Sequence, residues 1–188
     1  MSYSIIQPPF TLVFREMSKQ ELRDYFQWFM DVLPQRINEL AGAVRRTHDF
    51  ATWQPDHTPA SLDVLGNWFA AQVETRPRTL EELQAIEKRL VFPMEIPGDD
   101  LTDRTFSLAM DVGMYFSQVM IKNHPSLRWE LPTHNKGFAD YGQPVLVGFG
   151  RVPLNPIGIA VTSAYGIAAK NPRPLRDVYD VWSRMVSP

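Results

Sequence analysis

The strongest constraint on the fold is a long apolar pattern with helical spacing between residues 101 and 122. Apolar and small side chains recur every three or four residues and line one broad face: Phe106, Ala109, Val112, Gly113, Phe116, Val119 and Met120. A face this wide is typical of a helix that is covered on more than one side. We therefore expect this helix to be central, with Gly113 allowing another backbone to approach closely at a cost of about 1 kcal/mol in helix propensity.

A capping box of Ser18 and Glu21 predicts the start of an earlier helix, because each residue can bond to a free backbone N–H group at the helix end. Pro34 lies inside the apolar pattern that follows. Since proline lacks an N–H group and clashes with the preceding turn, we expect this helix to end there and a second helix to follow. Residues 11–14 (TLVF) before the capping box predict a short strand.

The middle of the chain carries two more helix starts. Thr58, followed by Pro59, predicts a helix after the polar loop 47–58. Thr79 and Glu82 form a second capping box, which predicts a short helix through Leu90. The next segment, VFPMEIPGDD (91–100), holds two prolines, so we expect a loop or a short edge strand.

Two short runs predict an antiparallel hairpin. Leu127, Trp129 and Leu131 alternate with polar residues, the pattern of a half-buried strand. Residues 145–149 (VLVGF) are more fully apolar and predict a second strand, which the polar segment 132–143 joins to the first.

The C-terminal region adds helices and completes the fold prediction. Residues 157–169 are ambiguous between strand and helix, and we interpret them as a helix because alanine and the closing Lys-Asn-Pro favour it. A last helix is predicted after Pro174, with four residues on its buried face: Leu175, Val178, Trp182 and Met185. The sum predicts a helix-rich α+β fold with a small antiparallel sheet. We expect a single domain over residues 1–188, in which a helical part (1–98) can pack on an α+β part (99–188).

Composition excludes several classes of function. The chain has no cysteine, so disulfides, thiolate catalysis and cysteine-based zinc sites are excluded. The net charge is −2 and basic residues are not clustered, which argues against a nucleic-acid partner. The N-terminus has no basic region of a signal peptide, and the apolar run 157–169 is too short to cross a membrane. We therefore expect a cytoplasmic protein of bacterial type with no membrane partner.

Catalytic and cofactor motifs are not apparent. His124, Glu130 and His134 have a spacing unlike the HExxH motif of metalloproteases. Neither the G-x-S-x-G elbow nor S-x-x-K occurs. Gly148-Phe-Gly150 follows a predicted strand, but Pro153 stands where a dinucleotide-binding loop needs glycine. We assign no catalytic residue, no metal ligand and no cofactor.

Two polar loops remain as candidates for binding another protein. The first loop contributes Trp53, Asp56 and His57. An aromatic residue in a loop, here Trp53, covers a small cluster of side chains or anchors a partner. The second candidate patch lies between the predicted hairpin strands and has four members: His134, Lys136, Asp140 and Tyr141. The sequence leaves open whether the loops 47–58 and 132–143 converge.

The C-terminal half resembles a class of small uncharacterised bacterial α+β proteins. The resemblance covers residues 103–186 and rests on four segments: DVGMYFSQVMIKNHP, LRWEL, YGQPVLVGFG and LRDVYDVWSRMV. Some proteins of this look accompany polymorphic toxins as immunity proteins. The resemblance therefore implies a non-enzymatic module that works by binding another protein, and it assigns a role to no single residue.

Two other functions stay open at this stage. The first is a small metal-dependent or His/Asp-based hydrolase that uses His124, Glu130, His134 or Asp140. The second is a small-molecule sensor with a pocket between the long helix and the sheet. The sequence does not give the oligomeric state.

Overall fold

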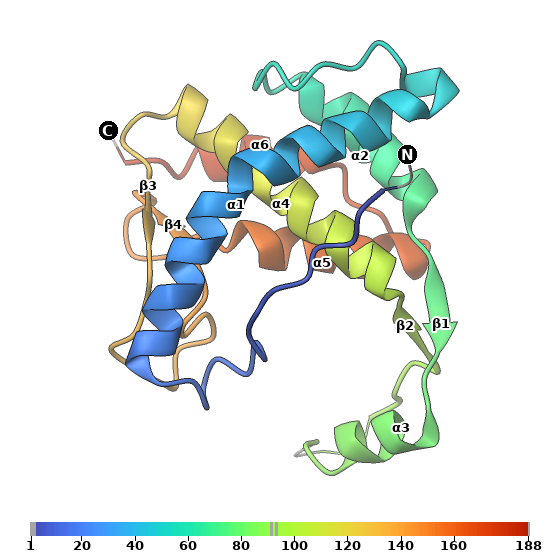
Figure 1. Ribbon diagram of the computed structural model, residues 1–188, viewed down its shortest axis with the longest axis vertical. Coiled ribbons are helices and arrows are strands. Elements are labelled where there is room, and N and C mark those ends of the chain that lie inside the picture. Colours follow the sequence, from blue (N-terminus) through green and yellow to red (C-terminus); the bar gives the residue numbers. More distant parts are fainter. Residues whose placement is uncertain (1–2, 91, 93, 188) are drawn as a thin grey trace.

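A computed structural model describes residues 3–90, 92 and 94–187 of the chain, and the helix-rich α+β fold is confirmed (Figure 1). The described residues form six α-helices and one short 3-10 helix: α1 (Lys19–Arg46), η1 (His48–Phe50), α2 (Ser61–Gln72), α3 (Leu80–Glu87), α4 (Asp103–Asn123), α5 (Pro156–Ala168) and α6 (Leu175–Ser183). Four short strands form two separate antiparallel pairs: β1 (Thr75–Pro77) with β2 (Asp99–Leu101), and β3 (Arg128–Glu130) with β4 (Val145–Val147).

Helix α4 is central, as the sequence predicts. Every residue from Ser107 to Ser117 is buried, and the helix packs against α1, α2 and α5. A Cβ atom added at Gly113 would lie 2.7 Å from the carbonyl oxygen of Pro156 and 2.9 Å from Cα of Ile157. Glycine at this position therefore lets the first turn of α5 approach the backbone of α4 directly.

Helix α1 runs without interruption through Pro34, so the predicted break there is wrong. Pro34 is exposed, whereas Leu33 and Ile37 beside it are buried against the core. The hydrogen bond that proline cannot donate is thus lost on the solvent side, where water can bond to the free carbonyl group. The apolar side chains before and after Pro34 are buried against the core, and this burial keeps the helix continuous through the proline.

The segment before α1 is also not as predicted. Residues 11–14 form no strand; the chain there is irregular and ends in a turn. Phe10 and Phe14 instead pack on Tyr25 of α1, with ring centroids 5.6 and 5.2 Å apart, respectively. These rings border a second small cluster of buried side chains: Met17, Leu22, Tyr25 and Tyr141.

The predicted hairpin is confirmed. Trp129 of β3 lies opposite Leu146 of β4, and Leu146 also pairs with Leu154 in an isolated bridge. The polar segment between the strands forms a long irregular loop that lies beside the N-terminal end of α1, where Gly142 contacts Leu22.

Residues 75–101 form a projection that we call the arm, made of β1, α3 and β2 (Figure 1). The Thr79–Glu82 capping box is confirmed, but α3 ends at Glu87 rather than at Leu90. Strand β2 begins at the end of the segment 91–100, of which residues 91 and 93 lie outside the described part.

The C-terminal helices follow the prediction with one exception. Residues 157–169 are helical almost throughout, within α5. Leu175 is buried and Val178 and Trp182 are half-buried, but Met185 is 42% exposed because α6 ends at Ser183.

Candidate protein-binding surface

The two predicted polar loops lie at opposite ends of α1. The loop 47–58 follows the last turn of this helix. The loop 132–143 lies at its first turn, where Lys136 Nζ donates a hydrogen bond to the carbonyl group of Arg15 at 3.0 Å. A helix of 28 residues separates them, which corresponds to about 40 Å at about 1.5 Å per residue. The two loops therefore do not form one site.

Trp53 is a core residue, although it comes from a polar loop. Its side chain is only 5% exposed, and its indole Nε1 donates to the carbonyl oxygen of Ser61 at 3.1 Å. Its ring meets that of Tyr115 edge-on at 5.3 Å. The expectation that Trp53 forms part of an exposed patch is wrong, because the loop folds back over the start of α2.

The side chains of Asp56 and His57 have different partners and are not hydrogen-bonded to each other. The carboxylate of Asp56 accepts hydrogen bonds from the N–H and hydroxyl groups of Thr58, both at 2.8 Å, and these bonds lower the pKa of Asp56. The His57 ring lies over Tyr115 at 5.4 Å, and its Nδ1 is buried without a hydrogen-bond partner among the described residues. Burial first, and then the nearby Lys122 cation, lower the pKa of His57.

The second loop divides into exposed and buried members. His134 and Lys136 are exposed, whereas Tyr141 is 3% exposed and belongs to the small cluster beside Leu22. Tyr141 therefore does not offer its ring to a partner. Asp140 is half-buried and accepts a hydrogen bond from the side-chain amide of Asn155 at 2.8 Å.

The three residues considered for a metal site are dispersed. His124 ends α4, and its Nε2 lies 3.0 Å from the hydroxyl group of Ser183. Glu130 is exposed on β3 and His134 on the following loop. Over residues 3–90, 92 and 94–187, no group of three histidine, aspartate or glutamate side chains is close enough to hold a metal ion.

An open hollow beside α5 was not predicted. We call it the α5 groove: it has a volume of about 850 Å³ and lies between α5, α6 and the segments 152–155 and 171–173. Its wall includes Asp140 at the N-terminal end of α5, Arg173 beyond the C-terminal end, and Trp182 of α6. One residue of the predicted second patch, Asp140, thus borders this groove.

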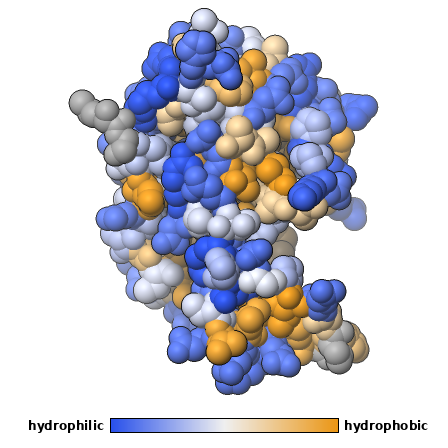
Figure 2. All heavy atoms as spheres, turned by 90° about the vertical axis from the view of Figure 1, so that its right-hand side faces the viewer, coloured by the Kyte–Doolittle hydropathy of each residue, from blue (hydrophilic) through white to orange (hydrophobic). Residues whose placement is uncertain are grey.

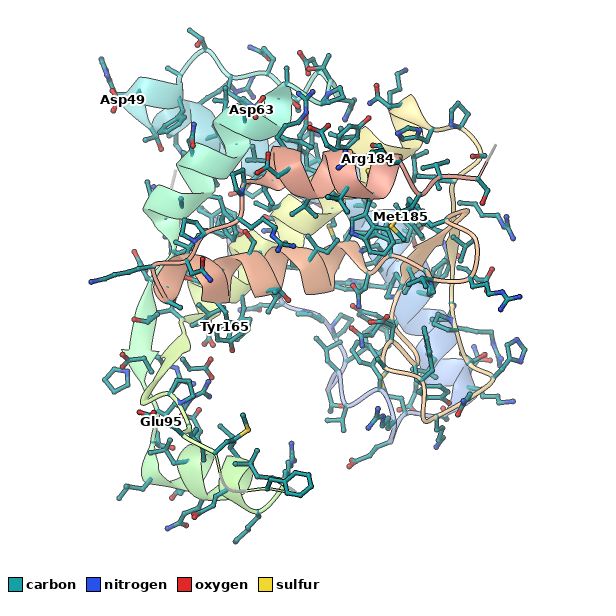
Figure 3. All side chains as sticks on the ribbon, turned by 180° about the vertical axis from the view of Figure 1, so that it is seen from behind. Asp49, Asp63, Glu95, Tyr165, Arg184 and Met185 are labelled. Carbon is teal, nitrogen blue, oxygen red and sulfur yellow. The ribbon has the colours of Figure 1, made fainter. Side chains whose placement is uncertain are left out.

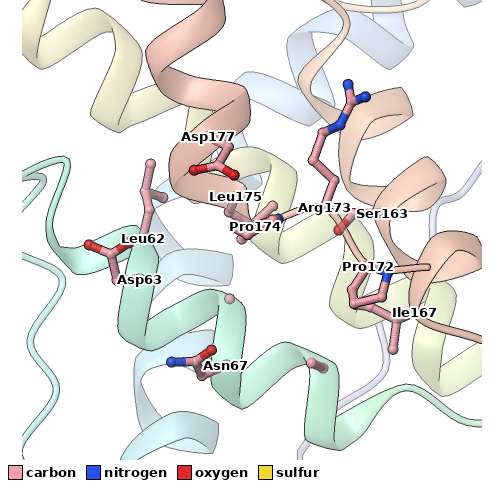
Figure 4. Close-up of a pocket in the computed structure, with 12 residues that line it drawn as sticks. Leu62, Asp63, Asn67, Ser163, Ile167, Pro172, Arg173, Pro174, Leu175 and Asp177 are labelled. Carbon is pink, nitrogen blue, oxygen red and sulfur yellow. The ribbon is translucent and has the colours of Figure 1, made fainter. Parts of the chain in front are cut away.

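A second cavity continues the α5 groove toward α2. It has a volume of about 430 Å³ and shares Ser163 and Arg173 with the groove. Figure 4 shows Asp63 and Asn67 of α2 on one side and Arg173 on the other. The two hollows together follow most of the length of α5.

Helix α5 is largely apolar and only partly covered: seven of its residues are half-buried, and Thr162, Tyr165 and Ala168 are exposed. Of its thirteen residues, three are buried: Pro156, Ala160 and Ala164. A helix that is apolar on all sides is normally enclosed by protein. The weakly polar run 157–169 indicates an apolar helix in the sequence, but the sequence does not show which side of that helix the rest of the chain covers.

The arm is joined to α5 by a charged contact at its base. Tyr165 of α5 donates to Asp100 at 2.6 Å, and Asp100 pairs with Arg78 at 2.7 Å. Burial is the main reason that the pKa of Tyr165 is raised. Figure 3 places Tyr165 above the arm and Glu95 on it.

None of the helices in the described part of the chain combines the length and the apolar character needed to cross a membrane. Comparison with models of protein families, with curated proteins and with solved structures gave no match.

Proposed function

We propose that this protein is a non-enzymatic module of the bacterial cytoplasm that binds another protein through the α5 groove. The observation that carries the proposal is the half-buried, largely apolar surface of α5, which borders an open hollow of about 850 Å³. Contiguous exposed apolar surface at a groove is a common mark of a protein–protein interface.

The composition of the groove supports a protein partner. The α5 residues that line it are mostly small, with Ile159 and Tyr165 as the larger ones, and its wall carries the large aromatic side chain of Trp182. Charged groups are few and stand near the two ends of α5, where Asp140 and Arg173 lie. A groove with small side chains, an aromatic wall and charged groups at its rim can receive a helix or an extended segment.

The groove and the resemblance fall on the same part of the chain. Residues 103–186 include α4, α5 and α6 as well as Asp140, so the groove lies within the region of resemblance. We therefore extend the proposal to an immunity-like protein, whose partner would be a toxin that it blocks by occupying part of its surface.

Thr162→Arg is the direct test. Thr162 is exposed on α5 and lines the groove, so a long cationic side chain there fills the groove without disturbing the core. The tagged protein should capture one stoichiometric protein from its source organism, and Thr162→Arg should lose that protein at unchanged melting temperature. Ala71→Arg is the matched control, because Ala71 is exposed on α2 and does not line either hollow.

Other outcomes would reassign the function. A native mass raised by a small molecule, with no protein partner, would indicate a sensor. Stoichiometric bound metal would indicate the metal-dependent hydrolase instead. A partner that both arginine variants retain would show that binding occurs elsewhere on the protein.

A further inference from the structure

His57 has an unusual backbone conformation in a loop that we call the His57 loop, residues 51–60 between η1 and α2. Its φ of 60° lies in the left-handed region, which residues with a side chain rarely adopt. Its N–H group donates to the hydroxyl group of Tyr115 at 3.1 Å, and its carbonyl group accepts from the side-chain amide of Asn123 at 2.9 Å. Because a strained backbone persists only where its surroundings hold it, these two contacts with α4 keep the loop closed.

The His57 ring cannot satisfy a second proton in the place where it lies. The ring centroid is 5.4 Å from that of Tyr115, and Nδ1 is buried without a hydrogen-bond partner among the described residues. A neutral ring can carry its proton on Nε2 and leave Nδ1 bare, whereas a protonated ring has an N–H group on both nitrogens. Protonation in the closed loop therefore buries a donor that has no acceptor, which costs free energy.

Two charged groups of the described residues act on His57 in opposite directions. Lys122 of α4 disfavours a second cation, whereas Asp56 favours it, although the Asp56 carboxylate is already bonded to the N–H and hydroxyl groups of Thr58. Tyr115 beside the ring stays neutral, since burial raises its pKa above the ordinary value of 10.0. Burial and Lys122 together outweigh Asp56, so the pKa of His57 in the closed loop lies below 6.5.

We propose that the His57 loop is a pH-sensitive switch, which is closed on α4 while His57 is neutral and opens when His57 is protonated. In the open loop the ring reaches water, which can accept from both N–H groups, and the backbone can leave the left-handed region. Opening uncovers Trp53 and Tyr115, which are 5% and 0% exposed and meet edge-on at 5.3 Å. Hydrophilic side chains predominate on the upper part of the molecule in Figure 2, where the loop lies (Figure 1), so acid adds aromatic rings to a polar surface.

The same contacts extend to the first turn of α2. The hydroxyl group of Tyr115 lies 2.7 Å from that of Ser61, and the indole of Trp53 donates to the Ser61 carbonyl group at 3.1 Å. Ser61 is followed by Leu62 and Asp63, which line the cavity that continues the α5 groove. Opening therefore removes two contacts that fix one wall of this cavity, but the switch does not depend on the proposed function.

The direction and size of the response follow from proton linkage. In the open loop the pKa of His57 is near its ordinary value of 6.5, so the open loop binds a proton more strongly than the closed loop does. For each pKa unit between the two states, full protonation raises the ratio of open to closed loop about tenfold. The loop is thus closed above pH 6.5 and opens progressively as the pH falls below this value.

An NMR titration of the full chain between about pH 8 and pH 5 is the test. The ring carbon signals of His57 should give a midpoint below 6.5. The protection of the Trp53 indole N–H group against hydrogen exchange, expressed relative to free indole at the same pH, should fall as His57 becomes protonated. Trp129 is the internal control, because its indole nitrogen is also buried but belongs to β3, and its protection should not change.

Two variants separate the switch from a general loss of stability in acid. His57→Asn removes the titrating group and tolerates the backbone conformation, so Trp53 should stay protected throughout. Lys122→Gln removes the cation that opposes protonation and should move the midpoints of His57 and Trp53 upward together. Lys88→Gln is the matched control, since Lys88 is exposed on the arm. A His57 midpoint at or above 6.5, or Trp53 protection that ignores the titration or falls equally in His57→Asn, would overturn the proposal.

Discussion

Arg36 of α1 and Asp111 of α4 form a buried ion pair in which two guanidinium nitrogens donate to the two carboxylate oxygens at 2.8 and 2.7 Å. The Asp111 side chain is fully buried and that of Arg36 is 9% exposed. Burial raises the pKa of Asp111 to about 6, and the bonds from Arg36 oppose this rise. The pair joins α1 and α4, the two longest helices of the described residues, and its carboxylate is shielded from water.

Replacing one partner of this pair should destabilise the protein strongly. Asp111→Asn keeps the shape of the side chain but leaves the Arg36 cation without its counter-ion, which costs about 3–5 kcal/mol. Urea denaturation should show this loss in the free energy of unfolding. The double variant Arg36→Met/Asp111→Leu should lose much less, because apolar side chains remove both charges together. Equal losses in the two variants would show that the loss comes from shape rather than from the unpaired charge.

Tyr3 extends this network to the N-terminal segment. Its hydroxyl group donates to Asp111 at 2.5 Å and accepts from Arg36 at 2.9 Å. Tyr3→Phe should lower the free energy of unfolding by about 1–3 kcal/mol, since buried polar groups lose a partner. Hydrogen exchange of the Ile6 amide, which donates to Ser107, should also become faster. The control Ile5→Ala changes a 42% exposed side chain and should leave both quantities nearly unchanged.

Gly113→Ala tests the close approach of α4 and α5. The added methyl group would lie 2.7 Å from the carbonyl oxygen of Pro156, a backbone atom that cannot move alone. We expect a net loss of about 1–3 kcal/mol from overpacking, although alanine is the better helix former. Gly98→Ala is the matched control, because nothing lies within 4 Å of the added carbon there. Denaturation curves of the two variants should differ accordingly; a stabilised Gly113→Ala would contradict the close packing.

Local signals in the sequence predicted the elements whose cause is local. The capping boxes at Ser18 and Thr79 depend on residues three apart, and the helical spacing around Gly113 spans one segment, so a single stretch of sequence contains all the information. Pro34 was misjudged because the apolar residues that hold α1 together gain their stability from α4, which lies far away in the sequence.

The candidate site was harder to predict for the same physical reason. Trp53 and Tyr141 looked exposed in polar loops, but each loop folds onto a helix and buries the ring. To predict the α5 groove, one must know which side of α5 the rest of the chain covers. This depends on how α5 packs against the other helices, which its own sequence does not show. Asp140 is the one predicted residue that borders the groove.

The pH dependence of the arm follows from Glu82. Hydrogen bonds from Arg76 first, and then from the Thr79 amide, lower the pKa of Glu82 to about 2 from an ordinary value of 4.5. A carboxylate with a lowered pKa stabilises the folded arm above the ordinary value, and this stabilisation is lost as the pH falls through about 2. Carbon-detected NMR titration of the Glu82 carboxyl group should show its midpoint well below those of exposed glutamates, and Arg76→Gln should move it upward. An unshifted midpoint in the original protein would contradict the pairing.

The protonation of His57 gives a second pH effect. Acidification adds a positive charge to His57, whereas it removes a negative charge from Glu82. Its folded-state pKa lies below 6.5, chiefly because of burial, so just below pH 6.5 the unfolded chain binds more protons at this site than the folded one. Stability should therefore fall as the pH drops through this range. His57→Asn removes the titrating group, and asparagine tolerates the backbone φ of 60° found here. Urea denaturation at several pH values should show a smaller loss on acidification in this variant than in His134→Gln, where the replaced histidine is exposed. Equal pH slopes in the two variants would mean that His57 is not the residue responsible.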